Sequence, residues 1–164
     1  MVTIRPYTTE DRGEIWELKS AFERELGALG SDDKRQMYAG KLTPEYKQRY
    51  LEWVEFCSSK NSECIQLAEV KNDVIGYGFV LPELLTLIWD AAVINEIYVT
   101  ASHRGTGIAD ALLEELLATA KNQQLPIQRV VLDVDQSNER ARQFYEKHGF
   151  EHWGEMVAKD LTDE

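Results

Sequence analysis

Apolar residues near the start of the chain recur first at strand spacing and then at helix spacing. Val2 to Arg5 predicts a short strand that ends at Pro6. A helix is expected from Thr8 onwards, because hydroxyl and acidic side chains favour a helix N-terminus. We expect this helix to end at Gly27 or Gly30. Its apolar face comprises Ile15, Trp16, Leu18, Phe22 and Leu26.

A polar segment separates this helix from a second one. Residues 31–41 carry no apolar periodicity and are expected to be irregular. The second helix is predicted to open at Thr43-Pro44-Glu45, where the missing N–H of a first-turn proline costs nothing. One of its faces carries Tyr46, Tyr50, Trp53, Val54 and Cys57.

The middle of the chain predicts extended structure. Cys64–Val70 and Val74–Leu81 flank the turn residues Lys71-Asn72-Asp73, which is typical of a β-hairpin. Leu84–Trp89 and Ala91–Val99 are expected to add two further extended segments.

The remainder predicts a helix, a strand, a helix and a last strand. Apolar residues form one stripe on a helix that begins near Gly107. Gln128–Val134 is expected to be a strand, Ser137–His148 a helix that ends before Gly149, and residues 155–161 a final strand. The order of elements predicts an α/β fold: a mixed, mostly antiparallel central sheet with helices on both faces.

Length and composition limit the class of protein. With 164 residues, 43% of them hydrophobic and 29% charged, the chain is expected to form one domain over residues 1–164. A formal charge of −11 argues against nucleic acid as a partner, because the phosphates would be repelled. Neither a signal pattern nor a membrane-length apolar run is found, so a cytoplasmic protein without a membrane partner is expected. Cys57 and Cys64 lack metal-ligand spacing, so we expect reduced thiols and no metal.

The segment from Arg104 to Ala109 joins a predicted strand to a predicted helix. Gly105 and Gly107 allow a turn whose free amides would lie at the positive end of the helix dipole, which favours phosphate oxygens. A Walker loop is excluded because no Gly-Lys-Ser/Thr triplet occurs, and Asp110 breaks the dinucleotide fingerprint. A tight turn without a ligand is the alternative.

A second group of residues follows on the last predicted helix. Asn138, Ala141 and Tyr145 share one face, and the small alanine leaves room for a slender ligand. A phenol at Tyr145 is able to protonate a departing anion. The alternative is structural, with Tyr145 in the core and Asn138 as a helix cap.

Together the two groups resemble the GNAT superfamily of acyl-CoA-dependent N-acetyltransferases. The resemblance spans about residues 64 to 160 and implies a GNAT-like acyl-CoA N-acyltransferase fold with acetyl-CoA as co-substrate. It rests on Ile97-x-Val99, on Arg104-Gly105-Thr106-Gly107-Ile108-Ala109, and on Asn138-x-x-Ala141-x-x-Phe144-Tyr145 followed by Gly149-Phe150.

The resemblance also implies roles for these residues. The backbone of Arg104, Gly105, Thr106, Gly107, Ile108 and Ala109 would hold the pyrophosphate. Backbone groups of Ile97 and Val99 would pair with the pantetheine arm, and Asn138 would contact the arm from the other side. Tyr145 would protonate the departing thiolate. The amine would attack the thioester directly, so neither cysteine is expected to act as a nucleophile.

The residues alone do not single out the general base that takes a proton from the incoming amine. Glu96 is the best candidate, acting through a water, and the alternatives are that it anchors a cationic substrate or pairs with a neighbouring arginine. Strand alternation is expected to place Asn95 and Glu96 on opposite faces, so that only one of them faces the cleft.

A small cationic or aromatic amine is slightly favoured as acceptor, while amino acids and peptide amines stay open. Two other functions also stay open: a non-catalytic acyl-CoA-binding regulatory domain and an interaction module. The apolar segment at residues 84–89 is expected to be a buried part of the sheet, and an edge that pairs with a second subunit in a homodimer is the alternative.

Overall fold

The computed structural model describes residues 1–162, which fall into two compact units. The first unit is Met1–Leu132, the second begins at Asp133, and each is described by itself. The prediction of one domain over residues 1–164 therefore stays a prediction. Within residues 1–162, none of the helices combines the length and the apolar character that a membrane span requires.

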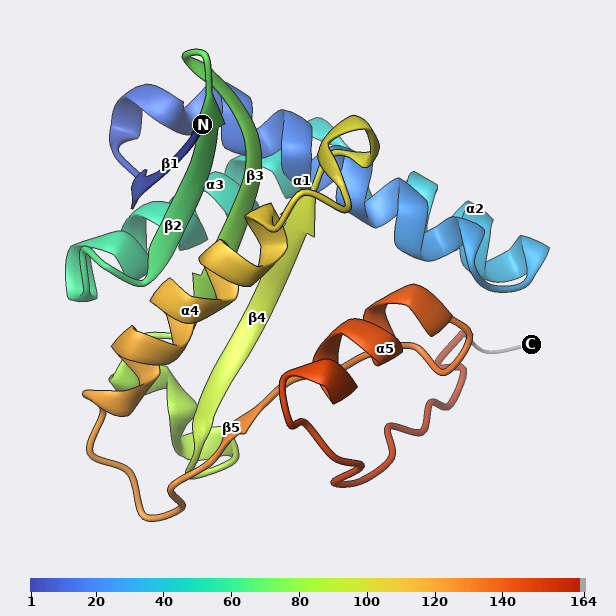
Figure 1. Ribbon diagram of the computed structural model, residues 1–164. Helices are drawn as coiled ribbons and strands as arrows, with labels where there is room; N and C mark the ends of the chain where they lie inside the picture. Colours follow the sequence, from blue (N-terminus) through green and yellow to red (C-terminus); the bar gives the residue numbers. More distant parts are fainter. Residues whose placement is uncertain (163–164) are drawn as a thin grey trace. The chain divides into compact units, whose positions relative to one another are not determined.

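The first unit is built around a five-stranded sheet with the order β1-β2-β3-β4-β5 (Figure 1). Neighbouring strands run antiparallel from β1 to β4, and β5 runs parallel to β4. The mixed, mostly antiparallel sheet is as predicted from the order of elements. The strands are β1 (Val2–Pro6), β2 (Ile65–Val70), β3 (Asp73–Val80), β4 (Ala92–Val99) and β5 (Val130–Val131).

Helices cover both faces of this sheet, as predicted. Helix α4 (Ile108–Lys121) lies across one face, while α1 (Arg12–Ala28) and α3 (Pro44–Lys60) lie behind it in Figure 1. Gly78 permits the close approach of α4, because a Cβ atom there would lie 2.7 Å from Leu116 Cδ1. The apolar stripe of α4 is buried against the sheet, with Leu112, Leu113 and Leu116 fully enclosed.

The hairpin between β2 and β3 turns at the predicted residues. Lys71 and Asn72 have φ angles of 52° and 72°, the paired left-handed conformation that matches the twist of a two-residue hairpin. The turn brings Val70 opposite Asp73. Local turn chemistry thus aligns the two central strands of the sheet.

A β-bulge interrupts the pairing of β3 with β4. Phe79 pairs with Glu96, but the next residue, Val80, pairs with Ile94. Asn95 therefore has no partner on β3, and the bulge reorients the side chains around it. The candidate site described below includes this bulged part of β4.

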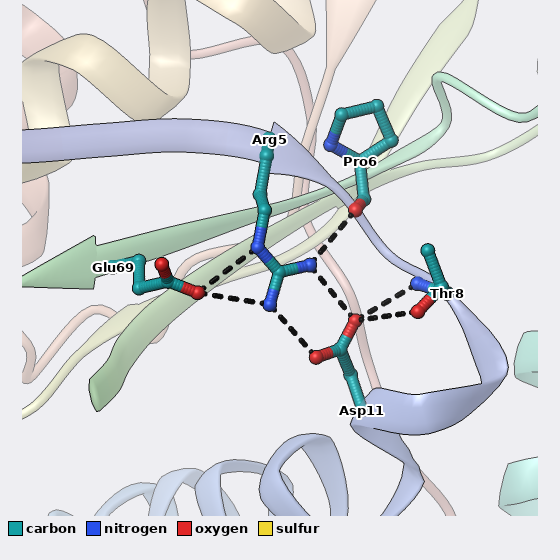
Figure 2. A network of polar contacts seen from close by, with 5 residues as sticks. All are labelled: Arg5, Pro6, Thr8, Asp11 and Glu69. Atoms are coloured by element: carbon teal, nitrogen blue, oxygen red, sulfur yellow. Dashed lines mark hydrogen bonds and ion pairs between the residues drawn. The ribbon is translucent and has the colours of Figure 1, made fainter. Parts of the chain in front are cut away.

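Arg5 ties the first strand to the segment that follows it (Figure 2). Its guanidinium donates to both carboxylate oxygens of Asp11, at 2.9 and 2.8 Å, and to Glu69 on β2 at 3.0 Å. Asp11, at the end of the 3-10 helix η1 (Thr9–Asp11), also accepts from the amide of Thr8. The hydrogen bond from Arg5 lowers the pKa of Asp11 against the opposing effect of burial.

Two segments differ from the predicted elements in the first unit. Residues 31–41 were expected to be irregular, but Asp32–Gly40 forms helix α2, capped by Ser31, whose hydroxyl accepts from the amide of Lys34. Because α2 has no buried residue, it needs no apolar periodicity. Residues 84–89 were expected to be extended, but Glu83–Ile88 is a 3-10 helix, η2. Leu87 and Ile88 are each 71% exposed, so this segment adds no strand to the sheet.

The C-terminal part also departs from prediction. The predicted strand 128–134 is much shorter in the structure: only Val130–Val131 pairs with β4. No strand forms at residues 155–161, which are exposed throughout and pair with no other described segment. The predicted last helix is confirmed as α5 (Glu139–Lys147), and Gly149 follows it with a φ of 86°.

Candidate active site

The turn at residues 104–109, called the glycine turn below, leads from the 3-10 helix η3 (Ala101–His103) into α4. Gly105 and Gly107 have φ angles of 77° and 85°, which side chains other than glycine rarely tolerate. A Cβ atom built on either glycine would meet nothing within 4 Å. The turn therefore needs glycine for its backbone shape and leaves open space above it.

The amides of this turn are available. Within residues 1–162, the backbone N–H groups of Gly105, Thr106, Gly107, Ile108 and Ala109 donate no hydrogen bond. Further into α4, the amide of Ala111 donates to Gly107 O at 3.1 Å. Several unused donors thus gather at the positive end of a helix of 14 residues, an arrangement that binds phosphate.

The side chain of Arg104 turns away from these amides. Its Nη2 atom lies 2.8 Å from both carboxylate oxygens of Glu25, and its Nε donates to Val99 O at 3.0 Å. The guanidinium also lies over the ring of Tyr98, 5.5 Å from its centre. Since Glu25 neutralises this cation, the glycine turn offers an anion its backbone rather than the charge of Arg104.

The strand β4 has an open edge beside the glycine turn. Strand β5 pairs only with Ala92 and Val93, and beyond them no described strand bonds to this side of β4. Ile97 and Val99, the residues predicted to hold an extended ligand, lie on the unpaired stretch. An extended chain is able to add to such an edge through main-chain hydrogen bonds.

The bulge at Asn95 opens a second part of the site. A hollow of about 480 Å³, called the amine pocket below, is lined by Lys19, Tyr46, Arg49, Tyr50, Trp53, Asn95 and Glu96. The expectation that only one of Asn95 and Glu96 faces the cleft is wrong, because both line this pocket. The extra residue of the bulge breaks the strand alternation on which that expectation depended.

Glu96 is the most heavily bonded side chain of the pocket. It is only 7% exposed, and its Oε1 accepts from the hydroxyls of Tyr50 at 2.7 Å and Tyr77 at 3.0 Å. Its Oε2 accepts from Lys19 Nζ at 2.6 Å. A buried carboxylate is stable only with such partners, and here they come from α1, α3 and β3.

Lys19 belongs to a wider set of paired charges. Its Nζ also lies 2.6 Å from Glu23 Oε2, and Glu23 forms a second ion pair with Lys41. Burial alone would lower the pKa of Lys19, but the negative charges of Glu96 and Glu23 outweigh it and the pKa is raised. Burial likewise opposes ionisation of Glu23, yet Lys19 and Lys41 hold its pKa below the ordinary value.

The two thiols lie within the first unit as unreactive groups. Cys57 and Cys64 are both fully buried, and burial raises the pKa of each to about 12. A thiolate is the nucleophilic form, and it is scarce at neutral pH when the pKa is so high.

Two predicted residues lie in the second unit. Asn138 caps α5, because its side-chain oxygen accepts from the amide of Ala141 at 3.2 Å. Tyr145 is 9% exposed and packs edge-on against Phe150, with ring centres 5.4 Å apart. Burial raises the pKa of Tyr145 against the opposing charge of Arg140, so its phenol stays protonated at neutral pH. Among the described residues its hydroxyl makes no hydrogen bond.

Pattern analysis missed four residues in or next to the amine pocket. Lys19 and Glu23 are spaced as an ordinary exposed pair on a helix, so their burial leaves no local signal. Tyr77 lies in a continuous run of buried strand residues, so it resembles any core residue. Arg49 lies on the polar side of its helix, and only the folded chain brings it to the pocket.

Comparison with known proteins points to one family. The family model described as "Acetyltransferase (GNAT) family" matches residues 26–150. An uncharacterized N-acetyltransferase of Mycobacterium tuberculosis is 42% identical over 57 residues, which are 35% of this chain and 35% of the relative. The matched segment thus spans about a third of that relative. A 5-NmdU N-acetyltransferase of Pseudomonas phage PaMx11 is 27% identical over 133 residues, 80% of this chain and 89% of the relative.

A solved structure shares the fold. The PaiA N-acetyltransferase of Thermoplasma acidophilum, in complex with coenzyme A, superposes with a TM-score of 0.70 at 20% sequence identity. The superposition covers 92% of this chain and 90% of that one.

Proposed function

This chain belongs to the GNAT acetyltransferase family, and from that premise we propose that it is an N-acetyltransferase that moves the acetyl group of acetyl-CoA to a primary amine. The amine attacks the thioester carbonyl directly, and no covalent enzyme intermediate forms. High thiol pKa values at Cys57 and Cys64 support this route, because neither cysteine is a ready nucleophile.

The observation that carries the proposal is the set of unused amides at the glycine turn. Five consecutive N–H groups, from Gly105 to Ala109, have no partner within the described residues and lie at the N-terminus of α4. A Cβ atom at Gly105 or Gly107 would meet nothing within 4 Å, so no side chain of the turn blocks an approaching anion. These features fit the pyrophosphate of coenzyme A, which the amides and the helix dipole stabilise together.

The thioester arm is assigned to the open edge of β4. Backbone groups of Ile97 and Val99 pair with the pantetheine amides as a neighbouring strand would, and Asn138 contacts the arm through its side-chain amide. Pairing along the edge leads the thioester towards the bulge at Asn95. Donors at this edge also stabilise the oxyanion that forms when the carbonyl is attacked.

Proton transfers complete the reaction. The attacking nitrogen forms a bond to the carbonyl carbon, the carbon–sulfur bond breaks, and Tyr145 gives its phenolic proton to the departing thiolate. The incoming ammonium loses one proton through a water to Glu96, and the nitrogen loses a second proton as the amide forms, which restores the phenol of Tyr145. Glu96 lines the amine pocket, where Lys19, Tyr50 and Tyr77 fix the direction of its carboxylate.

The acceptor is an amine of a small molecule or a peptide. Among the relatives, the phage enzyme is named for 5-NmdU, and the thermoplasmal structure holds coenzyme A. Both names support an amine-acetylating enzyme that uses a coenzyme A thioester. A non-catalytic acyl-CoA-binding domain is the second candidate, because the same glycine turn would serve it.

Two measurements test the proposal. Acetyl-CoA at a hundred times its dissociation constant should raise the free energy of unfolding by about 2.7 kcal/mol, which a thermal shift detects. Release of free coenzyme A thiol with a panel of primary amines separates an enzyme from a binding domain. Binding without thiol release for any amine would favour the regulatory domain, and absence of binding would overturn both functions.

A further inference from the structure

The charged groups beneath the amine pocket balance one another. Glu96 and Glu23 are buried carboxylates, and the cations Lys19 and Lys41 pair with them. Two positive and two negative charges leave this set with no net charge. Glu96 alone would attract a cationic substrate, but the ammonium of Lys19 lies only 2.6 Å from its Oε2.

Arg49 adds a positive charge that has no ion-pair partner among the described residues. Its side chain lines the same pocket from α3, and within residues 1–162 it forms no hydrogen bond or ion pair. The charged residues that line the pocket are thus Lys19 and Arg49 against Glu96, which leaves one positive charge. This excess is local, since the whole chain carries a formal charge of −11.

The uncharged walls of the pocket are aromatic. Tyr46 and Tyr50 stack with ring centres 6.4 Å apart, and Trp53 lines the same hollow. Trp16 supports both tyrosines from α1, with ring centres 6.0 Å from each. Flat apolar walls of this kind bind a planar ring through its faces and edges.

Resting on the proposed function, we propose that the acceptor is an aromatic primary amine that also carries an anionic group, a carboxylate or a phosphate, and that Arg49 selects it. The ring packs against Tyr46 and Trp53, and the guanidinium of Arg49 pairs with the anion. The local positive charge also disfavours the ammonium form of the acceptor, so the neutral amine that attacks the thioester forms more readily. Polyamines and other acceptors with a second cation are rejected by the same charge.

Pairs of acceptors that differ only in a charged group far from the reacting amine test this assignment. Benzylamine is compared with 4-(aminomethyl)benzoate for the carboxylate, and pyridoxamine with pyridoxamine 5′-phosphate for the phosphate. We expect kcat/KM to be about fivefold higher for the anionic member of at least one pair, the size of an exposed ion pair. The pair with the larger ratio identifies which anion the site prefers. 1,4-Bis(aminomethyl)benzene, which replaces the anion by a second cation, is expected to be the poorest benzylic acceptor.

Charge variants at Arg49 show whether this residue is responsible. Arg49→Gln should reduce the ratio of kcat/KM for the anionic over the neutral acceptor to about one. Arg49→Glu should reduce this ratio below one and should make the dication a better acceptor than the anionic compound. Lys47→Gln removes a positive charge from the same helix outside the pocket lining, and it should leave the ratio unchanged. An equal ratio in the wild-type protein and the Arg49→Gln variant would overturn the assignment.

Acceptor binding is also measured by titration calorimetry without acetyl-CoA, so the test does not depend on turnover. Tighter binding of the anionic acceptor, lost in Arg49→Gln, supports the assignment even in a protein that releases no thiol. Equal affinities of wild-type protein for both members of both pairs refute it, whatever the turnover. Failure of the proposed function would instead appear as absent thiol release with every acceptor.

Discussion

Lys19 Nζ lies 2.6 Å from Glu96 Oε2, although 77 positions separate the two residues in the chain. The bond joins α1 to the bulged part of β4 at the wall of the amine pocket. Both side chains are buried, so water can replace their contact only if the core opens. Packing of α1 on the sheet and the charge of the candidate site therefore depend on the same contact.

Removing the cation of this pair should strongly destabilise the fold. Lys19→Met leaves the carboxylates of Glu96 and Glu23 buried without their shared partner, and we expect the free energy of unfolding to fall by about 3–5 kcal/mol. Urea unfolding measures the loss. The double variant Lys19→Met/Glu96→Gln should lose less than the sum of the single variants, because it removes both members of the pair.

The exposed Lys47 provides the matched control for this experiment. Lys47→Met should change the free energy of unfolding by no more than about 0.5 kcal/mol. Similar losses in Lys19→Met and Lys47→Met, or strict additivity in the double variant, would show that the buried pair contributes no coupling.

The contact between Arg5 and Asp11 should make stability fall in acid. The hydrogen bond from Arg5 holds the pKa of Asp11 below its ordinary value, so the stabilisation is complete above the unfolded pKa of about 3.9. It is lost as the pH falls through the lower pKa of the folded state. Asp11→Asn should lower the free energy of unfolding by about 1–3 kcal/mol at pH 7.

Unfolding curves at several pH values check both parts of this prediction. The difference between wild-type protein and Asp11→Asn should be constant near neutrality and should narrow as the pH falls below about 4. Asp73→Asn, at an exposed position, should show no comparable difference at any pH. If the difference in free energy of unfolding between the two proteins increased in acid, the assigned direction of the pKa shift would be wrong.

A negative side chain in the glycine turn should block acetyl-CoA. Gly107→Glu places a carboxylate in the open space where phosphate is expected, and repulsion between like charges costs several kcal/mol. We expect the dissociation constant for acetyl-CoA to rise about a hundredfold or more. Gly13→Glu adds the same charge at an open position on α1 and should bind normally. Wild-type affinity in Gly107→Glu would refute the assignment of the pyrophosphate to this turn.

Loss of the Tyr145 hydroxyl should slow the reaction without weakening cofactor binding. A pKa raised by burial keeps this phenol protonated, as a general acid requires, and its removal should reduce turnover about 10²–10⁴-fold. Thiol release by Tyr145→Phe measures turnover, and calorimetry measures the affinity for acetyl-CoA. Tyr7→Phe is the control, because the Tyr7 hydroxyl is buried without a partner and should not affect turnover. A Tyr145→Phe variant as fast as the wild-type protein would remove this residue from the mechanism.

Local chemistry explains which parts of the protein are predictable from its sequence. Three features each depend on conformational preferences of neighbouring residues: the hairpin at Lys71 and Asn72, the start of α3 at Thr43-Pro44, and the turn at Gly105 and Gly107. Apolar periodicity likewise predicts α1, α3 and α4, because each must bury one face on the sheet. Helix α2 escaped prediction because it buries no residue, and its Ser31 cap was its main signal.

The strand-to-helix glycine turn, the order of the main elements and the family resemblance follow from the sequence, because they depend on residues adjacent or a few positions apart. Three other features become visible only in the folded chain: Lys19 holds Glu96, Arg104 pairs with Glu25, and a bulge brings Asn95 and Glu96 into one pocket. Each of these contacts joins residues from distant parts of the chain or depends on the pairing of two strands. Their energies arise from burial and charge pairing that exist only after the helices have packed on the sheet.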